Sequence, residues 1–215
     1  MTDLARSFKH LSSEEALRAL YVDFEGEKDQ PPVLLGVLRH PGSGSTPFVH
    51  RDVVDAMFAN LGGSSLSLRE AVEKTVRRAE HGHRRIVSWS EHDLGVVRTL
   101  WDEDPELVAR FEARYVNARA VAERWCNKIH GGDKPEKGRL ADYLALIGYP
   151  VPEEAAPGHV GETIRVLRSR LARGLPLTAA QRARWDRLGE HNRHDCAGMR
   201  RVCLIATKEL GAVAD

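Results

Sequence analysis

The sequence has 215 residues and a formal net charge of +1, with 42% hydrophobic and 29% charged residues. This length fits one domain with a sizeable core. The near-zero charge excludes the strongly basic nucleic-acid binders, whose whole surface attracts phosphate, so any polyanion must be bound by a local feature.

The cysteines and the N-terminal segment bear on the cellular compartment. Cys126, Cys196 and Cys203 are odd in number and lack the spacing of a metal site, which indicates reduced thiols that serve as packing residues. Residues 1–13 lack the apolar core of a secretory signal, and no window reaches the length of a membrane span. We therefore expect a cytoplasmic protein with no membrane partner.

The first fifty residues predict three strands. A short helix with a serine start is expected at 13–18, and a strand follows at about 19–25. Apolar runs predict further strands at 33–38 and near 48–50, separated by a turn-rich segment at 40–45. These three strands are expected to form an antiparallel meander.

The pattern then changes to alternating helix and strand. Leu68, Val72 and Val76 recur every four residues, which predicts a helix from Ser65 to Glu80. The β-branched and aromatic run at 84–90 predicts a strand, and a strand-helix-strand unit implies a right-handed crossover with a parallel neighbour.

The rest of the chain is expected to be mainly helical. Further predicted elements are a helix at 94–100, a helix that starts at Asp104-Pro105, a last strand at 114–117, and helices at 118–129, 139–147, 161–173 and 178–210, the last being one helix or two. The sequence thus predicts a single α/β domain over residues 1–215. Its mixed five-stranded sheet, with three antiparallel and two parallel strands, is flanked by helices, and a helical C-terminal part at about 138–211 packs on it.

Acidic residues gather where these elements end. Asp23 and Glu25 are two apart in a strand, so their side chains point to the same face. His191 and Asp195 are four apart on a helix and share a face, and Asp93 follows the strand at 84–90. If the last helix packs across the first strand, the four carboxylates and the imidazole meet.

Such a cluster suits particular metals and a particular chemistry. Carboxylates are hard oxygen ligands that Mg²⁺ and Mn²⁺ prefer. Two such ions can clamp a phosphodiester, one activating water and the other stabilising the leaving oxygen. His191 is placed to orient or deprotonate that water, since histidine is suited to general-base work at physiological pH.

Three segments that contain these residues, at 21–25, 89–94 and 191–196, resemble the three motifs of DEDD-type 3′–5′ exonucleases of the ribonuclease H-like superfamily. The likeness is greatest to a predicted RecB-associated nuclease group with a Tyr-Asn-x-x-Asp-Cys third motif, and it covers about residues 18–210. It implies a ribonuclease H-like fold and a hydrolase that degrades DNA or RNA from the 3′ end. The resemblance also implies the metal ligands of two Mg²⁺ or Mn²⁺ ions, which are Asp23, Glu25, Asp93 and Asp195.

Two departures from the motifs leave alternatives open. His191 stands where that group has its tyrosine, four residues before the last aspartate, whereas the histidine-bearing branch places its histidine five residues before. His191 is thus a candidate general base without a direct counterpart in either branch. Glu91, two residues before Asp93, is the alternative ligand in the second motif.

The substrate and the manner of binding are also open. The same site fits a structure-selective endonuclease, and a non-catalytic module that binds nucleic acid or protein is a third interpretation. Nothing resembles a base-reading motif, so low sequence specificity is expected, and a protein partner could supply extra grip on nucleic acid. Candidate phosphate-binding patches, each with an ordinary solvated surface as the alternative, are Arg165, Arg168, Arg170 and Arg173 in one helix, and Lys134, Lys137 and Arg139.

Overall fold

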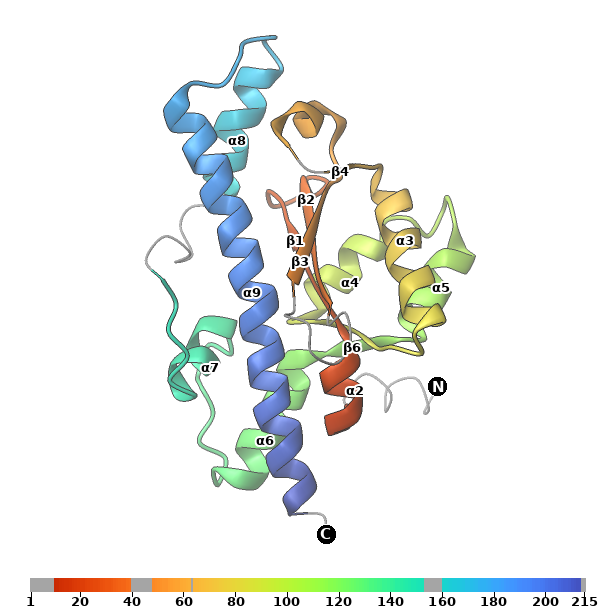
Figure 1. Ribbon diagram of the computed structural model, residues 1–215, viewed down its shortest axis with the longest axis vertical. Coiled ribbons are helices and arrows are strands. Elements are labelled where there is room, and N and C mark those ends of the chain that lie inside the picture. Colours follow the sequence, from red (N-terminus) through yellow and green to blue (C-terminus); the bar gives the residue numbers. More distant parts are fainter. Residues whose placement is uncertain (1–9, 40–47, 63, 153–159, 214–215) are drawn as a thin grey trace.

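A computed structural model describes residues 10–39, 48–62, 64–152 and 160–213. The predicted turn at 40–45 and most of the predicted loop at 152–157 lie outside these ranges. The described chain forms a mixed sheet with helices on both faces, which confirms the α/β prediction (Figure 1).

The sheet has six strands in the order β4-β3-β2-β1-β5-β6. Neighbours β1, β2 and β3 are antiparallel, while β5 is parallel to β1 and β6 is parallel to β5, as expected. The prediction of five strands was wrong, because a two-residue strand pairs parallel with β3 at the edge and is too short to show in the hydrophobic pattern. The bounds are β1 Leu20–Glu25, β2 Leu34–Arg39, β3 Phe48–Val53, β4 Ser64–Ser65, β5 Ile86–Ser88 and β6 Tyr115–Asn117.

The helices agree closely with the predicted segments, and the C-terminal segment is one continuous helix. Their bounds are α2 Ser13–Arg18, α3 Leu68–His81, α4 Glu91–Arg98, α5 Pro105–Glu112, α6 Ala118–Ile129, α7 Leu140–Leu146, α8 Val160–Leu171 and α9 Ala179–Ala212, with a 3-10 helix η1 at Ala56–Leu61. Several begin at a side-chain cap that satisfies free N–H groups, as Ser67 does for α3 and Thr178 for α9.

The helices form two layers around the sheet. Helix α9 runs along the molecule and crosses one face beside α6, α7 and α2, while α3, α4 and α5 cover the other face (Figure 1). Residues of β1 alternate between these layers: Leu20 and Val22 pack with α3, α4 and α5, whereas Tyr21 packs with α6 and α9. Because side chains alternate along a strand, Asp23 and Glu25 belong to the α9 face.

The cysteines fit the expected packing role. Cys126, Cys196 and Cys203 are free thiols, and all three are buried. They belong to the core between the sheet and α9. Within the described residues, no helix combines the length and apolar character needed to cross a membrane.

Candidate functional site

Asp23 and Glu25 form a carboxyl pair at the end of β1. The two carboxyls are neighbours on the same face of the strand, and Glu25 is only 6% exposed. After burial, the charge of Glu25 is the largest cause that raises the pKa of Asp23. Each carboxylate therefore makes it harder for the other to ionise.

Asp93 reaches the pair from α4. This helix begins at Glu91, one turn earlier than predicted, so Asp93 lies in its first turn. Its Oδ1 accepts a hydrogen bond of 3.2 Å from the main-chain N–H of Phe24, which places the carboxylate beside β1. Glu91, the alternative ligand, is exposed to solvent. The geometry thus brings Asp93, and not Glu91, to the other carboxylates.

His191 and Asp195 come from α9. His191 Nε2 lies 3.5 Å from Asp195 Oδ2 and 3.9 Å from Glu25 Oε1. One ligand atom from each of these three residues lies within 4.8 Å of the other two, which is close enough for a shared metal ion. Four of the predicted site residues, Asp23, Asp93, His191 and Asp195, line one recess, and Glu25 lies beside His191.

Burial raises the pKa of all four carboxyl groups. It is the largest cause at each position, and it raises the pKa of Glu25 to about 7 and that of Asp93 to about 6. The pKa of Asp23 lies well above its usual value because neighbouring carboxylates add to the effect of burial. For Asp195 the pKa is also raised by burial, against an opposing contribution from the His191 imidazole.

The cluster carries more negative charge than its protein neighbours neutralise. Among the described residues, no lysine or arginine forms an ion pair with these carboxylates. Glu25 Oε1 is buried and has no hydrogen-bond partner in the described part of the chain. Removing a charged oxygen from water without a partner costs free energy, so protons or a cation must compensate the carboxylates.

Asn192 is a site residue that the sequence reasoning missed. It is fully buried, and its Nδ2 donates hydrogen bonds of 3.0 Å to the main-chain oxygen of Asp23 and 2.8 Å to Asp23 Oδ2. The side chain fits because Gly36, the strand partner of Asp23, has no β-carbon; one built there would collide with Asn192 Oδ1. A glycine inside the apolar run of β2 was the available signal for this close approach.

A recess of about 550 Å³ opens beside the carboxylates. Basic and aromatic side chains form its wall together with the site residues; among them are Trp89, Arg119, Lys137 and Arg139. Trp89 Nε1 donates to the Gly138 main-chain oxygen, which leaves its ring at the wall. A negatively charged chain with flat bases is chemically suited to such a recess.

The predicted basic patch of four arginines at 165–173 has a structural role. Arg168 of α8 makes ion pairs of 2.7 Å with Glu27 and 3.2 Å with Asp55, and Arg165 also pairs with Glu27. The two remaining arginines of this run donate to main-chain oxygens. These contacts hold α8 against η1 and the loop after β1, and they engage the arginines that were predicted as a phosphate-binding patch.

Comparisons with protein-family models, with curated proteins and with solved structures found no similar sequence or structure.

Proposed function

We propose that this chain is a metal-dependent nuclease with a ribonuclease H-like fold, and that it removes nucleotides from the 3′ end of DNA or RNA. The observation that carries the proposal is the convergence of four carboxylates from β1, α4 and α9. The His191 imidazole lies beside two of them, and no lysine or arginine among the described residues forms an ion pair with any. The strand order β3-β2-β1-β5-β6, with three antiparallel strands followed by two parallel ones, is consistent with that fold.

The residues present fit a site for Mg²⁺ or Mn²⁺. The donors are the oxygens of four carboxylates, with the His191 imidazole beside them, and Glu25 Oε1 is a buried acceptor with no hydrogen-bond partner among the described residues. Hard divalent ions prefer such oxygen donors. Asp23, Glu25, Asp93 and Asp195 would hold the ions. When bound, such ions lower the pKa of water and neutralise charge on a phosphate.

The chain's own residues supply positioning and proton transfer. Asn192 fixes Asp23 through two hydrogen bonds, so that this carboxylate keeps one orientation. His191 is half-buried between Glu25 and Asp195, and its Nε2 faces both carboxylates. At Nε2 it would accept the proton of the attacking water, and the neighbouring carboxylates would stabilise the resulting imidazolium.

The recess gives the proposed substrate its place. Lys137 lines it and has no ion pair among the described residues, whereas Arg119 and Arg139 are oriented by Glu123 and Asp142. These cations would contact phosphates, which carry no sequence information. Low sequence specificity follows.

The test is cleavage of 5′-labelled single- and double-stranded DNA and RNA in the presence of Mn²⁺. The wild type should produce a ladder that shortens from the 3′ end, whereas Asp23→Asn and Asp195→Asn should produce none. Asp102→Asn, at an exposed position outside the recess, is the matched control and should cleave like the wild type.

Other results would redirect or refute the proposal. Cleavage of a substrate with a blocked 3′ end would favour the endonuclease that uses the same site. The absence of cleavage in all four substrates, together with no rise in melting temperature on addition of Mn²⁺, would favour the non-catalytic binding module.

A further inference from the structure

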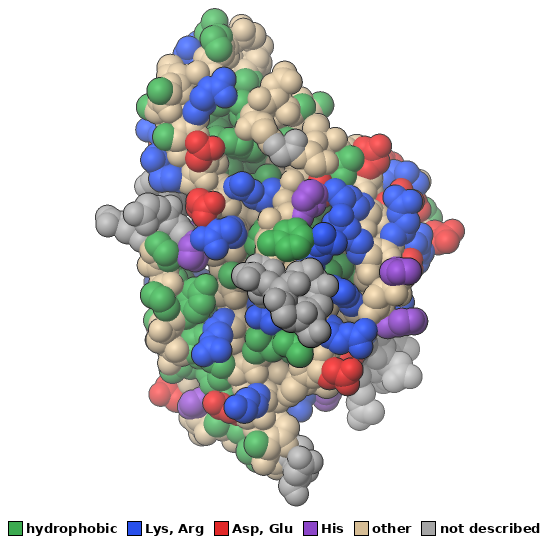
Figure 2. Space-filling view, viewed as in Figure 1, with side chains coloured by type: hydrophobic (Ala, Val, Ile, Leu, Met, Phe, Trp, Pro, Cys, Tyr) green, Lys and Arg blue, Asp and Glu red, His purple; other side chains and the backbone are tan. Residues whose placement is uncertain are grey.

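A second recess lies on the opposite face of the sheet from the carboxylates. Its volume is about 630 Å³, within the range of roughly 300–1,000 Å³ that is typical of ligand pockets. Most of its wall is basic, and it consists of Leu20, Arg39, Lys74, Arg77, Arg78, His81, Gly82 and Arg84. Figure 2 shows Lys and Arg side chains gathered in this region, over α3 and the adjoining strands.

Side chains alternate between the two faces along a strand, and this alternation places the recess and the proposed nuclease site on opposite faces of the sheet. Leu20 faces α3, whereas Asp23 and Glu25 face α9. Arg39 follows Leu35 and Val37 at two-residue spacing, and both of those residues pack in the core beneath α3. The basic recess is therefore walled by α3 and the start of β1, and it shares no lining residue with the carboxylate recess.

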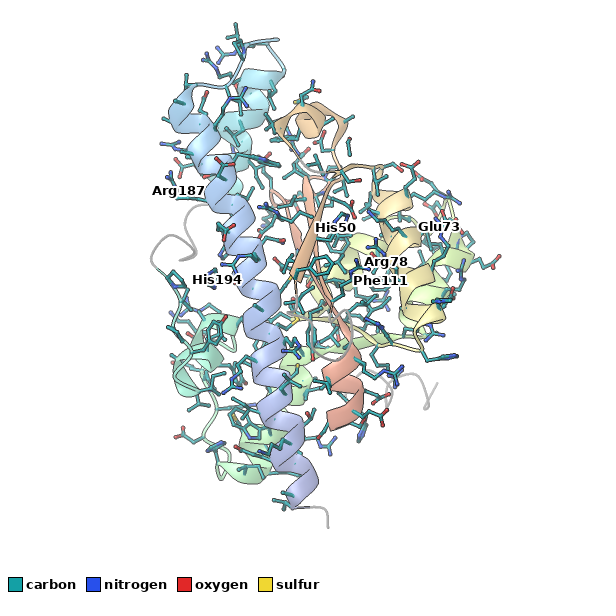
Figure 3. The ribbon with its side chains drawn as sticks, in the orientation of Figure 1. His50, Glu73, Arg78, Phe111, Arg187 and His194 are labelled. Carbon is teal, nitrogen blue, oxygen red and sulfur yellow. The ribbon has the colours of Figure 1, made fainter. Side chains whose placement is uncertain are left out.

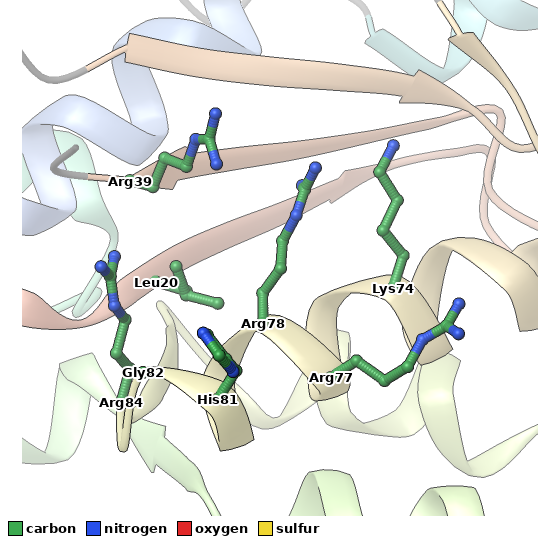
Figure 4. Close-up of a pocket in the computed structure, with 8 residues that line it drawn as sticks. All are labelled: Leu20, Arg39, Lys74, Arg77, Arg78, His81, Gly82 and Arg84. Atoms are coloured by element: carbon green, nitrogen blue, oxygen red, sulfur yellow. The ribbon is translucent and has the colours of Figure 1, made fainter.

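The basic side chains converge from several elements. Figure 4 shows Arg39 extending from the end of β2, and Lys74 and Arg78 rising from α3 toward the strands, while Arg77 turns away along the helix. Arg78 lies near His50 of β3 in the wider view (Figure 3). Arg39, Lys74 and Arg78 are each half-buried, so a ligand must enter the recess to reach them.

The available carboxylates are already engaged. The buried Asp52 of β3 accepts from Lys74 Nζ at 2.7 Å and also contacts His50 Nε2 at 3.1 Å. Glu73 lies 3.9 Å from Arg77, at the outer edge. Neither carboxylate forms an ion pair with Arg39 or Arg78, although the Asp52 charge acts on Arg78 from a distance.

Arg39 and Arg78 form no ion pair in the described part of the chain, and the Arg39 guanidinium lies over the Phe48 ring, 4.6 Å from its centroid. Arg39 Nε and Arg78 Nη1 are buried atoms with no hydrogen-bond partner in the described part of the chain. Burial lowers the pKa of Arg78, and the positive charge of Arg39 lowers it further, which shows that the two groups repel each other. An anion placed between them would relieve this repulsion and satisfy the free N–H groups.

We infer that this recess binds a phosphate group with more than one negative charge. Two guanidinium groups match phosphate oxygens in pairs, and Lys74 adds a third cation nearby. A terminal monoester or a polyphosphate carries two or more charges, whereas an internal phosphodiester carries one and is flanked by sugars that must fit the recess. Two kinds of molecule carry such a phosphate group. One is a free nucleotide or polyphosphate, and the other is a nucleic-acid strand with a phosphorylated 5′ end.

The test measures binding to the full chain by calorimetry, in phosphate-free buffer with EDTA so that no nucleic acid is hydrolysed. Tripolyphosphate, ADP, and one oligonucleotide with either a 5′-phosphate or a 5′-hydroxyl are titrated in turn. Wild type should bind at least one of the phosphate-terminated ligands saturably, with one site per chain. Arg39→Gln and Arg78→Gln should each weaken that binding at least about tenfold, as expected for the loss of a charged hydrogen-bonded contact.

The control variant is Arg182→Gln, because Arg182 is an exposed arginine of α9 outside the recess. It removes the same charge and should bind like the wild type. Preference for the 5′-phosphorylated oligonucleotide over its 5′-hydroxyl form would identify a strand end as the source, and tighter binding of ADP or tripolyphosphate would identify a free ligand. Absence of saturable binding to all ligands, or equal weakening in Arg182→Gln, would overturn the inference. Melting curves of each variant show whether it is folded.

Discussion

Glu25→Gln should make the metal-free protein more stable, although Glu25 belongs to the proposed site. The carboxyl is 6% exposed, and its pKa rises from 4.5 to about 7 on folding, mainly through burial. Above pH 7 the folded chain must hold a buried charge that the unfolded chain exposes to water. Each pKa unit corresponds to 1.36 kcal/mol, so this charge destabilises the fold by about 3 kcal/mol. Glutamine has the same shape and avoids that cost.

The pH dependence of the free energy of unfolding follows from the direction in which burial shifts the pKa of Glu25. Between the unfolded and folded pKa values, the folded protein binds a proton that the unfolded chain has lost, so stability falls as the pH rises through that window. The free energy of unfolding of the metal-free wild type should therefore decrease from about pH 5 to about pH 8, by an amount of the order of the 3 kcal/mol above. Asp93, with its pKa raised to about 6 by burial, contributes in the same direction.

The assay is urea unfolding with EDTA at both ends of this range. Glu25→Gln should exceed the wild type by about 3 kcal/mol at the higher pH and differ little at the lower pH. Glu91→Gln, at an exposed position of the same acidic region, should match the wild type at both. A Glu25→Gln variant that is less stable than the wild type at the higher pH would refute the reasoning, because it would mean that the carboxylate is stabilised where it lies.

Three further substitutions test the packing around the site. Asn192→Ala removes both hydrogen bonds to Asp23 and should cost about 1–3 kcal/mol in urea unfolding, with slower cleavage in Mn²⁺. Gly36→Ala inserts a β-carbon into the Asn192 side chain and should destabilise by about 1–3 kcal/mol in the same assay, since neither strand nor helix can move freely. Arg168→Ala leaves Glu27 without its 2.7 Å partner and should increase proteolysis or hydrogen exchange in α8 while leaving α3 unchanged.

Control variants with the same kind of substitution elsewhere show whether the loss of stability comes from the contacts described above. Asn127→Ala alters an exposed asparagine of α6 and should change neither unfolding nor cleavage. Gly95→Ala adds a β-carbon that meets no atom within 4 Å and should be neutral or stabilising in its helix. An Asn192→Ala or Gly36→Ala protein as stable as its control would contradict the contact between α9 and β2 described above. Unchanged exchange in α8 of Arg168→Ala would show that apolar contacts alone hold this helix.

Periodicity made most of the fold predictable. The four-residue spacing of Leu68, Val72 and Val76 located α3, and all three positions are indeed on its packed side. Short local patterns also sufficed for α6, whose predicted bounds of 118–129 agree with the structure. The strand β4 was missed because two serines carry no hydrophobic signal, and their pairing depends on where β3 lies.

The candidate site was predictable only in part. The spacing of Asp23 and Glu25, and of His191 and Asp195, specified which side chains share a face, because strand and helix periods are local properties. The contact of Asn192 with Asp23 joins residues 169 positions apart, and it depends on the packing of α9 over Gly36. The basic recess could not be predicted from the sequence either, because Arg39 and Arg78 come to line one recess only when α3 packs on the sheet.

All of the proposed nuclease chemistry depends on divalent cations at the carboxylates. Calorimetric titration of the full chain with Mn²⁺ tests this claim most directly, at about pH 8, which is above the pKa of about 7 for Glu25 and of about 6 for Asp93. Saturable binding of up to two ions per chain that is lost or strongly weakened in Asp23→Asn and Asp195→Asn, and retained in Asp102→Asn, is the predicted result. Wild-type protein that binds no Mn²⁺, or that binds it equally well after both substitutions, would contradict the metal site and the nuclease proposal with it.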